Sequence, residues 1–589
     1  MKKLLFLVFV FFVFIEIFGQ DKPKNFTIKL IETSDVHGAL FDYDFINDKK
    51  AKSSLAQVQS YINSEKTKQD IILMDNGDII QGQPIVYYYN YQNTADTHIV
   101  AKMLNYMNYD IATIGNHDIE AGHAVYDKLV KEYNFPLLAA NAIRTDNGKP
   151  YFKPYSILTR NGYKIAVLGL ITPGIPDWLP EELWKGIEFE DMIDCSKKWI
   201  PQIIEKEKPD LIVGLFHSGF DYTYANSTEN TSKNENASVL VAKQVPGFDI
   251  VFIGHDHYTW NEKVKDINGK DVLVLGPQSS ARQVSTATVH FSINEKGVTE
   301  KTIETEIVEI VKFKADSLFT TKFKNEFNEV KEYVSRPIGV FEKSVLTNDA
   351  IFGPSEFTEL IQKIQLEISN ADISFTAPLS INDTIKKGQV FVRDMFKLYR
   401  FENFLYTINL SGNEIKNYLE YSYNSWFNTM KTENDHILIF NTDSTGTHIF
   451  NEKYKNYTFK NNFYNFDVAA GIKYSVDISK PLNQKITIQS MSNGKPFYND
   501  SIYTVAINSY RGNGGGGLLT YGAGLNKDEI LKRRINSTDK DLRFYIMKWI
   551  EKKKIINPEI RPEWNIIPHD WWEKAVERDK EMLTKKNKK

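Results

Sequence analysis

The sequence predicts an α/β fold for the N-terminal half of the chain, with buried parallel strands as its framework. Five short runs are almost entirely apolar and do not alternate with polar residues, which is the pattern of strands buried on both faces. Each run ends in residues that bind metal ions, and the carboxyl ends of parallel strands are where α/β folds form their sites. The runs are residues 28–31, 71–74, 111–114, 211–215 and 250–253.

The residues that follow these runs include aspartate, asparagine and histidine, and each cluster has a glycine nearby. Together they offer oxygen and imidazole nitrogen donors, a mixture that suits two borderline divalent ions of the zinc, manganese, cobalt or iron class. Asp78 is well suited to bridge the two ions. The glycines allow the backbone to approach the ions closely. The candidate ligands are Asp35, His37, Asp78, Asn116, His217, His255 and His257.

Each of these segments has an ordinary explanation when it is taken alone. A histidine after a strand is usually a hydrogen-bonded loop residue, and Asn76-Gly77-Asp78 is a common turn sequence. Five such segments in succession, two of which present paired ligands from one turn, rarely arise from turn chemistry. We therefore interpret them as one metal site.

The size and charge of the chain limit the classes of protein to which it can belong. With 589 residues it is long enough for two domains and a connecting segment. A net charge of −3 gives no sign of a nucleic-acid polymer or an anionic membrane surface as a partner.

The first twenty residues predict a secretory signal peptide. Lys2 and Lys3 precede an apolar stretch over residues 4–15, and Gly19 offers a small residue near a cleavage point. An uncleaved anchor is the alternative, but the stretch is shorter than the roughly 20 residues that span a bilayer. Cys195 is the only cysteine, so no internal disulfide can form. We expect a periplasmic or otherwise extracytoplasmic protein without a stable membrane anchor.

The rest of the chain predicts a second domain. Residues 312–333 carry apolar residues at helical spacing, and strand signals then return near 373–375, 405–410, 472–478 and 503–507. The last segment carries four tryptophans and a lysine-rich end, which we interpret as a wrapping tail. The predicted organisation is a signal peptide at 1–20, a metal-binding domain at 21–310, a helical linker at 311–335, a ligand-recognition domain at 336–545 and a tail at 546–589.

A second ligand site is predicted in this second domain. Residues 508–513 follow a strand and run into four consecutive glycines. A glycine run is usually only a mobile turn, but Arg511 adds a guanidinium that suits phosphate or sugar oxygens. Phe401 can stack on a nucleobase, although it fits a core aromatic equally well. The candidate substrate-binding residues are Arg400, Phe401, Tyr510, Arg511, Asn513, Gly514 and Gly515.

These motifs resemble those of the periplasmic 5′-nucleotidase family, most of all its 2′,3′-cyclic-nucleotide 2′-phosphodiesterase/3′-nucleotidase branch. Residues 41–44, His257 and residues 464–467 favour that branch. The resemblance implies a calcineurin-like metallophosphoesterase β-sandwich flanked by helices in the order α/β/β/α. A C-terminal α/β domain of the 5′-nucleotidase type would then recognise the nucleotide. The matching segments are 33–37, 41–44, 75–82, 115–122, 254–257, 464–467 with Gly471, and 510–511.

The resemblance also implies a role for each candidate residue. One ion would be held by Asp35, His37, Asp78 and His257, and the other by Asp78, Asn116, His217 and His255. The ions would turn a bridging water into hydroxide and neutralise the phosphoryl oxygens. His117 would donate a hydrogen bond or a proton to the leaving group or transition state. Its carboxylate partner in the 5′-nucleotidases falls at Glu120, and Asp118 is the other candidate.

One position departs from the family pattern. The cyclic-phosphodiesterase branch stacks the base between two aromatics, of which one matches Phe401 and the other falls at Asn513. Tyr510 or a tryptophan of the tail would have to replace it. We expect an exported hydrolase of small nucleotides, with 2′,3′-cyclic-nucleotide 2′-phosphodiesterase and 3′-nucleotidase activity as the first hypothesis. One alternative is a 5′-nucleotidase or UDP-sugar hydrolase. Another is a non-catalytic nucleotide-binding surface protein, but such a protein should have lost metal-ligand residues, and this sequence keeps them.

Overall fold

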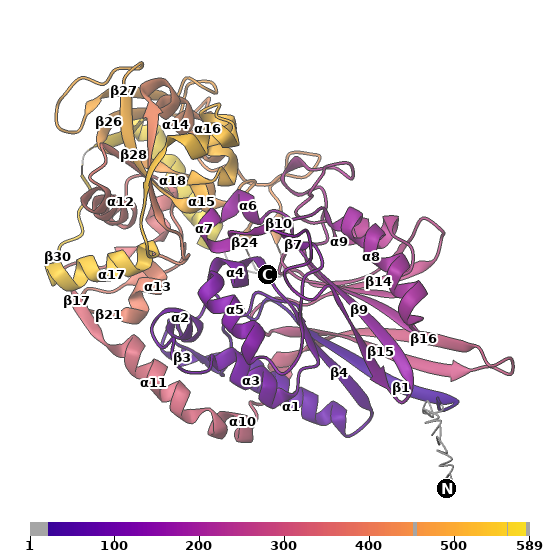
Figure 1. Ribbon diagram of the computed structural model, residues 1–589. Coiled ribbons are helices and arrows are strands. Elements are labelled where there is room, and N and C mark those ends of the chain that lie inside the picture. Colours follow the sequence, from indigo (N-terminus) through magenta and orange to yellow (C-terminus); the bar gives the residue numbers. More distant parts are fainter. Residues whose placement is uncertain (1–21, 452–455, 562, 585–589) are drawn as a thin grey trace, which may run out of the picture.

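The structure is a computed structural model that describes residues 22–451, 456–561 and 563–584. The predicted signal peptide at 1–20 and the lysine-rich end at 585–589 lie outside the described residues. Two domains lie side by side, the first mostly indigo to magenta and the second orange to yellow (Figure 1). Within the described ranges, no helix is both long enough and apolar enough to cross a membrane.

The first domain contains two sheets, each with six strands among the described residues. The strand orders are β16-β15-β1-β4-β5-β6 and β13-β14-β12-β11-β9-β8. The predicted strands are β1 (Asn25–Thr33), β4 (Asp70–Asp75), β5 (Ile111–Thr113), β11 (Leu211–His217) and β12 (Ile250–Ile253). β1, β4 and β5 are parallel neighbours, as are β11 and β12. The other strands are β6 (Leu137–Leu138), β8 (Tyr155–Arg160), β9 (Tyr163–Ile171), β13 (Trp260–Lys265), β14 (Asp271–Gly276), β15 (Gln283–Ile293) and β16 (Thr299–Glu309).

Helices cover both outer faces of this sandwich, so the predicted α/β/β/α layer order is confirmed. Apolar residues of both sheets fill the space between them, including Leu30, Met74, Val167 and Leu215. Helices α1 (Leu55–Lys66), α3 (Ile99–Met107) and α5 (His123–Glu132) pack on the first sheet, and α8 (Met192–Glu207) and α9 (Ser238–Gln244) pack on the second. Burial on both faces explains why the strand sequences read as unbroken apolar runs.

Two helices lie where the sequence predicts a helical linker. α10 (Ser317–Lys322) begins after Asp316, whose side chain accepts a hydrogen bond from the amide of Phe319. α11 (Lys324–Ser335) follows directly. It contacts α2 (Pro84–Tyr91) of the first domain and the short helix η4 (Val392–Asp394) of the second. The segment therefore runs along both domains (Figure 1), while the boundaries at 310 and 336 stay predictions.

The second domain is built on a mixed sheet with the order β25-β19-β28-β22-β29. β19 runs parallel to β28, whereas β22 runs antiparallel to it. Helices α12 (Glu356–Ser369) and α14 (Gly412–Trp426) pack on this sheet. The strands are β19 (Ile373–Thr376), β22 (Leu405–Ser411), β25 (Val468–Ala470), β28 (Ile502–Asn508) and β29 (Arg534–Ser537).

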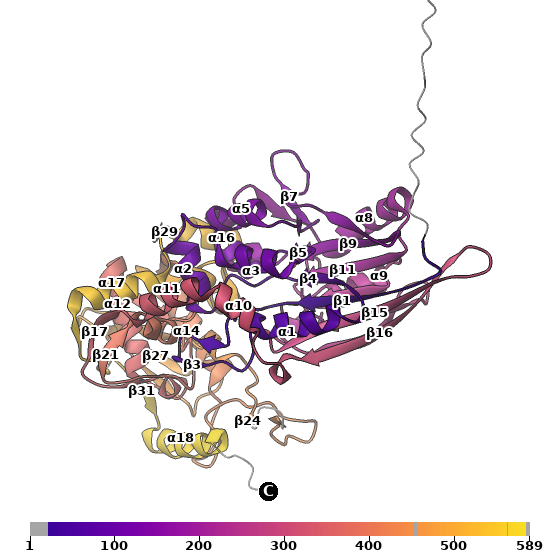
Figure 2. The ribbon, with the colours of Figure 1, turned by 90° about the horizontal axis from the view of Figure 1, so that it is seen from below.

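The C-terminal part of the chain is folded into the second domain. β31 (Trp564–Ile567) pairs in parallel with β26 (Ile472–Asp477), and α18 (His569–Thr584) lies outermost (Figure 2). Asp579 of α18 is buried and accepts hydrogen bonds from the amides of Ile437 and Leu438. Trp571 and Trp572 pack against the domain core. These two tryptophans of the predicted tail therefore pack in the second domain.

Candidate metal centre

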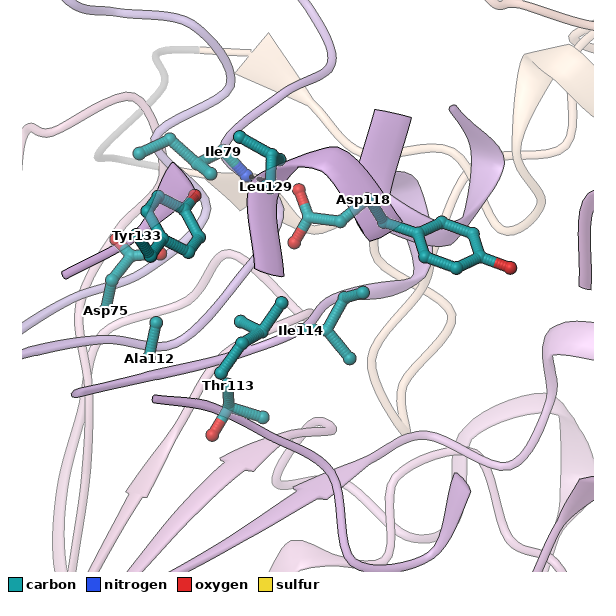
Figure 3. A pocket seen from close by; sticks show the side chains of 10 residues that line it. Asp75, Ile79, Ala112, Thr113, Ile114, Asp118, Leu129 and Tyr133 are labelled. Carbon is teal, nitrogen blue, oxygen red and sulfur yellow. Dashed lines mark hydrogen bonds between the residues drawn. The ribbon is translucent and has the colours of Figure 1, made fainter. Parts of the chain in front are cut away.

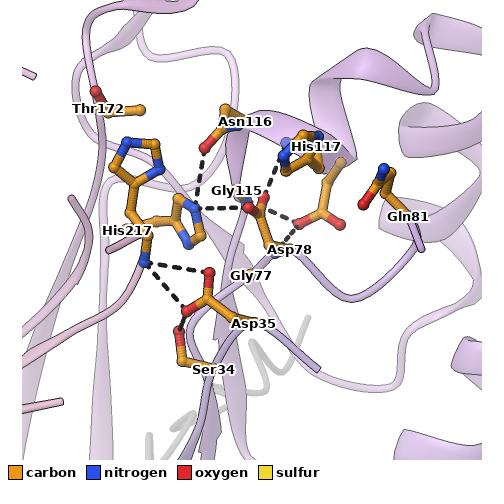
Figure 4. Close-up of polar contacts among 12 residues, drawn as sticks. Ser34, Asp35, Gly77, Asp78, Gln81, Gly115, Asn116, His117, Thr172 and His217 are labelled. Carbon is orange, nitrogen blue, oxygen red and sulfur yellow. Dashed lines mark hydrogen bonds and ion pairs between the residues drawn. The ribbon is translucent and has the colours of Figure 1, made fainter. Parts of the chain in front are cut away.

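The predicted ligands converge at the edge of the sandwich where the strands end. Figure 4 shows four of them, Asp35, Asp78, Asn116 and His217. They form two groups, and within each group the candidate ligand atoms lie within 4.8 Å of one another. The first group is Asp35, His37 and His257, and the second is Asp78, His217 and His255. Asn116 adjoins the second group, since its Oδ1 lies 3.1 Å from Nε2 of His217. Residues of both sheets therefore contribute to one site.

The backbone at these ligands has an uncommon conformation. Asp35, His37, Asp78, His255 and His257 all have positive φ angles, from 49° to 79°. Residues other than glycine seldom occupy this region. Such strain persists only where surrounding contacts impose it, and it concentrates at functional sites.

Glycines beside the ligands allow this close packing. A Cβ atom at Gly115 would collide with the carboxylate of Asp78, and one at Gly254 would lie 2.9 Å from Oδ2 of Asp35. A Cβ atom at Gly77 would lie 2.8 Å from the Cα of Gly115. No larger residue fits at these positions unless a ligand or the neighbouring backbone moves.

In the first group, three donor atoms face one another. Nε2 of His257 lies 3.3 Å from Oδ1 of Asp35 and 3.0 Å from Nε2 of His37. Burial, assisted by the neighbouring His257, lowers the pKa of His37 to about 3, so this imidazole is neutral. Although burial opposes it, the contact with His257 holds the pKa of Asp35 below its usual range. A carboxylate and a neutral imidazole are suitable cation ligands.

In the second group, Nε2 of His217 lies 3.2 Å from Oδ2 of Asp78, and both side chains are buried. Burial would lower the pKa of His217, but the carboxylate of Asp78 outweighs it and raises that pKa to about 10. For the same reason the pKa of Asp78 is held well below its usual range, although burial opposes this. A metal ion that binds here must displace the proton between the two groups.

Hydrogen bonds behind the ligands fix which nitrogen each imidazole presents. Nδ1 of His217 donates to the carbonyl oxygen of Asn76 at 2.6 Å, and Nδ1 of His37 lies 3.2 Å from the carbonyl oxygen of Gln81. In both rings Nε2 is then the nitrogen that faces the ligand group. Sequence reasoning missed Gln81, whose only signal is its place in the turn after Asp78. These oriented donors fit two borderline divalent ions.

His117 stands beside the two groups. Its Nδ1 lies 2.5 Å from Oε2 of Glu120, and its amide donates to Oδ1 of Asp78 at 2.8 Å. Burial would lower the pKa of His117, but the carboxylates of Asp78 and Glu120 outweigh it and raise that pKa to about 9. His117 is therefore protonated at neutral pH, and the carboxylate bound to its ring is Glu120.

Asp118 does not pair with the ring of His117, which corrects that alternative. Its carboxylate accepts hydrogen bonds at 2.8 to 3.2 Å from the amides of Asp78, Ile79, Ile80 and Gly115. Asp118 therefore holds the turn that carries Asp78. A cavity of about 10 Å³ lies beside it, lined by Asp75 and Tyr133 among others (Figure 3). This space has the size of about one water molecule, so it cannot admit a nucleotide.

The loop at residues 399–402 lies at the boundary between the domains. Arg400 is exposed in this loop and Phe401 is half-buried. Arg543 donates to two backbone carbonyls of the loop, and Tyr91 of the first domain donates to its glutamate at 3.1 Å. The loop is thus fixed from both domains.

Arg511 is not placed as the predicted phosphate or sugar contact. Its guanidinium is 1% exposed and pairs with the buried Asp467 at 3.0 Å. The other N–H groups donate to the side chain of Asn465 and to the carbonyl oxygens of Tyr464 and Gly515. All of its donors are used within the second domain. Arg511 therefore holds these loops together, and this corrects our expectation of a direct ligand contact.

The other residues of the glycine-rich loop are also packed. The guanidinium of Arg511 lies 5.2 Å from the ring centre of Tyr510, and Gly515 presses against the same ring. Asn513 is buried, and its amide lies 3.4 Å from the carbonyl oxygen of Trp178 in the first domain. Gly514 has a φ of 100°, which glycine accommodates without strain. Neither Trp571 nor Trp572 supplies the aromatic that is missing at Asn513.

Trp178 on the short helix α6 (Ile175–Trp178) is a site residue that sequence reasoning missed. Its ring stacks on His255 with centroids 5.7 Å apart and planes inclined by 19°. A Cβ atom at Gly174 would lie 2.6 Å from the indole, so this glycine provides its space. Asp177 pairs with Lys527 of the second domain, and α6 faces α15 (Ser509–Gly512) (Figure 1). This segment therefore connects the metal centre with the second domain. The only feature of the sequence that could have indicated Trp178 is its position after the strand β9.

Comparisons with known proteins agree with this architecture. Residues 28–259 match the calcineurin-like phosphoesterase family, and residues 337–522 match the 5′-nucleotidase C-terminal domain. The chain is 26% identical over 559 residues to the 2′,3′-cyclic-nucleotide 2′-phosphodiesterase/3′-nucleotidase of Salmonella typhimurium, which covers 83% of this chain and 81% of that protein. It is 25% identical over 601 residues to the trifunctional nucleotide phosphoesterase protein YfkN of Bacillus subtilis, covering 92% of this chain and 39% of that longer relative.

The crystal structure of a putative 5′-nucleotidase from Staphylococcus aureus matches with a TM-score of 0.74 at 21% identity, over 92% of this chain and 99% of that one. The fold and the matched domains define the chain as a metallophosphoesterase, a hydrolase that uses divalent metal ions. It joins a calcineurin-like domain to a 5′-nucleotidase C-terminal domain, and this pair of domains agrees with the resemblance to the 5′-nucleotidase family. The predicted family and two-domain fold are confirmed. The roles of single residues stay predictions.

Proposed function

We propose that the protein hydrolyses small nucleotides, as a 2′,3′-cyclic-nucleotide 2′-phosphodiesterase with 3′-nucleotidase activity. The observation that carries this proposal is the pair of ligand groups beside a protonated histidine. Two divalent ions bound there would activate water and neutralise phosphoryl oxygens. The similarity to the Salmonella enzyme over most of both chains supports the cyclic-nucleotide assignment.

The residues of the chain would contribute orientation and proton transfer. Asp78 has one oxygen toward His217 and the other fixed by the amide of His117, so its carboxylate is held at the centre of the site. His117 carries a proton that Glu120 stabilises through Nδ1, which leaves Nε2–H as a donor to the leaving oxygen or to the phosphoryl group. Proton donation of this kind assists departure of the ribose oxygen.

The second domain would hold the nucleoside. Phe401 is half-buried at the domain boundary, and its ring centroid lies 6.5 Å from that of Tyr464. The two rings are inclined by 71° to each other. An aromatic face can stack on a base and tolerates different bases. The metal centre and this aromatic pair come from different domains, so the substrate would bind between them.

A substrate panel tests the proposal and its main alternative. The full-length protein loaded with Mn²⁺ or Zn²⁺ is given 2′,3′-cyclic nucleotides, 3′-nucleotides, 5′-nucleotides and UDP-sugars. We expect the highest kcat/KM with 2′,3′-cyclic and 3′-nucleotides. The highest value with 5′-nucleotides or UDP-sugars would instead establish the 5′-nucleotidase or UDP-sugar hydrolase alternative. We also propose export, which fractionation of expressing cells tests, because the leader pattern at 1–20 is typical of secreted proteins.

A further inference from the structure

Three of the candidate imidazole ligands, His37, His217 and His255, have one ring nitrogen that contacts a protein group outside the ligand cluster. His255 uses a different nitrogen for this contact than the other two. In His217 and His37, Nδ1 is turned toward a backbone carbonyl of the turn after β4. In His255 it is Nε2 that is occupied, 3.0 Å from Oε1 of Glu235. The partner is thus a carboxylate, and it comes from the loop between β11 and α9.

This loop is fixed to the metal centre by its backbone. The hydroxyl groups of Thr172 and Ser218 both donate to the carbonyl oxygen of Glu235, at 3.0 and 2.7 Å. Ser218 directly follows the ligand His217, and Figure 4 shows Thr172 at the margin of the site. The neighbours Asn234 and Asn236 are buried. Glu235 is therefore carried on a rigid support.

The other contacts of His255 restrict its ring further. Trp178 stacks on one face of the imidazole, and the amide of His255 donates to Oδ2 of Asp35 at 3.1 Å. With one face covered and Nε2 engaged, Nδ1 is the nitrogen left to meet Asp78 and His217 in the second ligand group. A carboxylate on the outer nitrogen fixes the tautomer and raises the basicity of the nitrogen that binds the ion.

We propose that Glu235 is a positioning residue that presents Nδ1 of His255 to the ion of the second ligand group. The inference rests on the proposed two-ion centre and adds a residue to it. Glu235 accepts a hydrogen bond from Nε2–H, so the lone pair of His255 lies on Nδ1. Loss of such an outer partner typically costs about 10- to 100-fold in metal affinity.

Calorimetric titration of the metal-free full-length protein with Mn²⁺ tests this without any substrate. Glu235→Ala is expected to weaken one of the two binding events by about 10- to 100-fold and leave the other unchanged. Glu235→Gln should recover most of the loss, because its amide oxygen still accepts from Nε2–H. The matched control is Glu229→Ala, which removes an exposed carboxylate from the same loop and should bind as the unaltered protein does.

Three results would overturn the proposal. Glu235→Ala could bind both ions with unaltered affinity, or lose both equally together with a lower melting temperature. Glu235→Gln could also lose as much affinity as the alanine variant, in which case the hydrogen bond is not the cause. Failure of the proposed function has a different signature, since the Mn²⁺ affinities would follow the expected pattern while no nucleotide in the substrate panel is hydrolysed.

Discussion

The strand ends of the first domain and the arginine loop of the second both gather charged groups, but they arrange them in opposite ways. Around Asp35, His37 and His257, donor atoms point at one another across 3.0 to 3.3 Å. Around Arg511, each N–H group of the guanidinium donates to an acceptor of the protein, and the carboxylate of Asp467 lies at 3.0 Å. Converging ligand atoms of this kind suit a cation, whereas a completed ion pair stabilises the fold. Removal of one residue should therefore lower hydrolysis in the first region and lower stability in the second.

The largest effect should come from the centre of the metal site. Asp78→Asn removes the charge that faces His217 and that we assign to both ions, so hydrolysis should fall close to background. The protein should stay folded, as measured by its melting temperature, because asparagine keeps the size of the side chain and an acceptor oxygen for the amide of His117. Full metal occupancy with near-normal turnover in this variant would contradict the bridging role.

His117→Asn should give a smaller loss with a different signature. Because His117 acts on the reacting groups, kcat should fall by about 10²- to 10⁴-fold. Metal content, measured by elemental analysis, should be unchanged. A parallel loss of metal would mean that His117 is a ligand.

Arg511→Ala tests the other side of the comparison. It leaves the buried carboxylate of Asp467 unpaired, which typically costs about 3–5 kcal/mol. Urea unfolding should therefore show an earlier transition for the second domain. Hydrolysis of bis-(p-nitrophenyl) phosphate under native conditions should persist, because that ester needs the metals and not the nucleotide pocket. Unaltered unfolding with a raised KM for nucleotides would restore Arg511 as a ligand residue.

Phe401→Ala should affect binding of the nucleoside alone. Base stacking is worth about 1–3 kcal/mol, so KM for nucleotides should rise by roughly 5- to 150-fold. Turnover of bis-(p-nitrophenyl) phosphate should stay the same. Equal losses for both substrates in a folded variant would show that Phe401 is a core residue.

The pH dependence should follow the proton on His117. Its pKa is raised to about 9, so activity should hold through neutral pH and fall as the pH rises past about 9, where the imidazole loses its charge. Glu120→Gln removes one of the two carboxylates that raise this pKa, and the decline should then begin at lower pH. If the decline of activity at high pH occurs at the same pH in Glu120→Gln, the group that causes it is not His117.

The convergence of the candidate ligands was largely predictable because its signals are local. Each ligand directly follows a buried strand, and parallel strands bring their carboxyl ends together whatever the details of packing. The layers of the first domain were implied by the resemblance to the 5′-nucleotidase family, and apolar runs indicated strands of the second domain. The choice between Asp118 and Glu120 needed the structure, since both are within three residues of His117.

Other features depend on contacts between segments far apart in the chain. Arg511 is buried because Asp467, 44 residues away, reaches it across the second domain. Trp178 and Glu235 meet His255 only once loops after β9 and β11 fold over the site. Neither residue follows a pattern of spacing that hydrophobic periodicity could reveal. Residue type therefore predicted a substrate contact at Arg511, which the structure does not show, and gave no sign that Glu235 lies at the site.

The most direct test of the two-ion phosphoesterase is a metal titration read by hydrolysis. Metal-free full-length protein is titrated with Mn²⁺ while bound metal and hydrolysis of bis-(p-nitrophenyl) phosphate are measured together. We predict that hydrolysis reaches its maximum only when both ligand groups are filled, at two ions per chain. Full hydrolysis with one ion or none, or two bound ions without hydrolysis, would contradict the account.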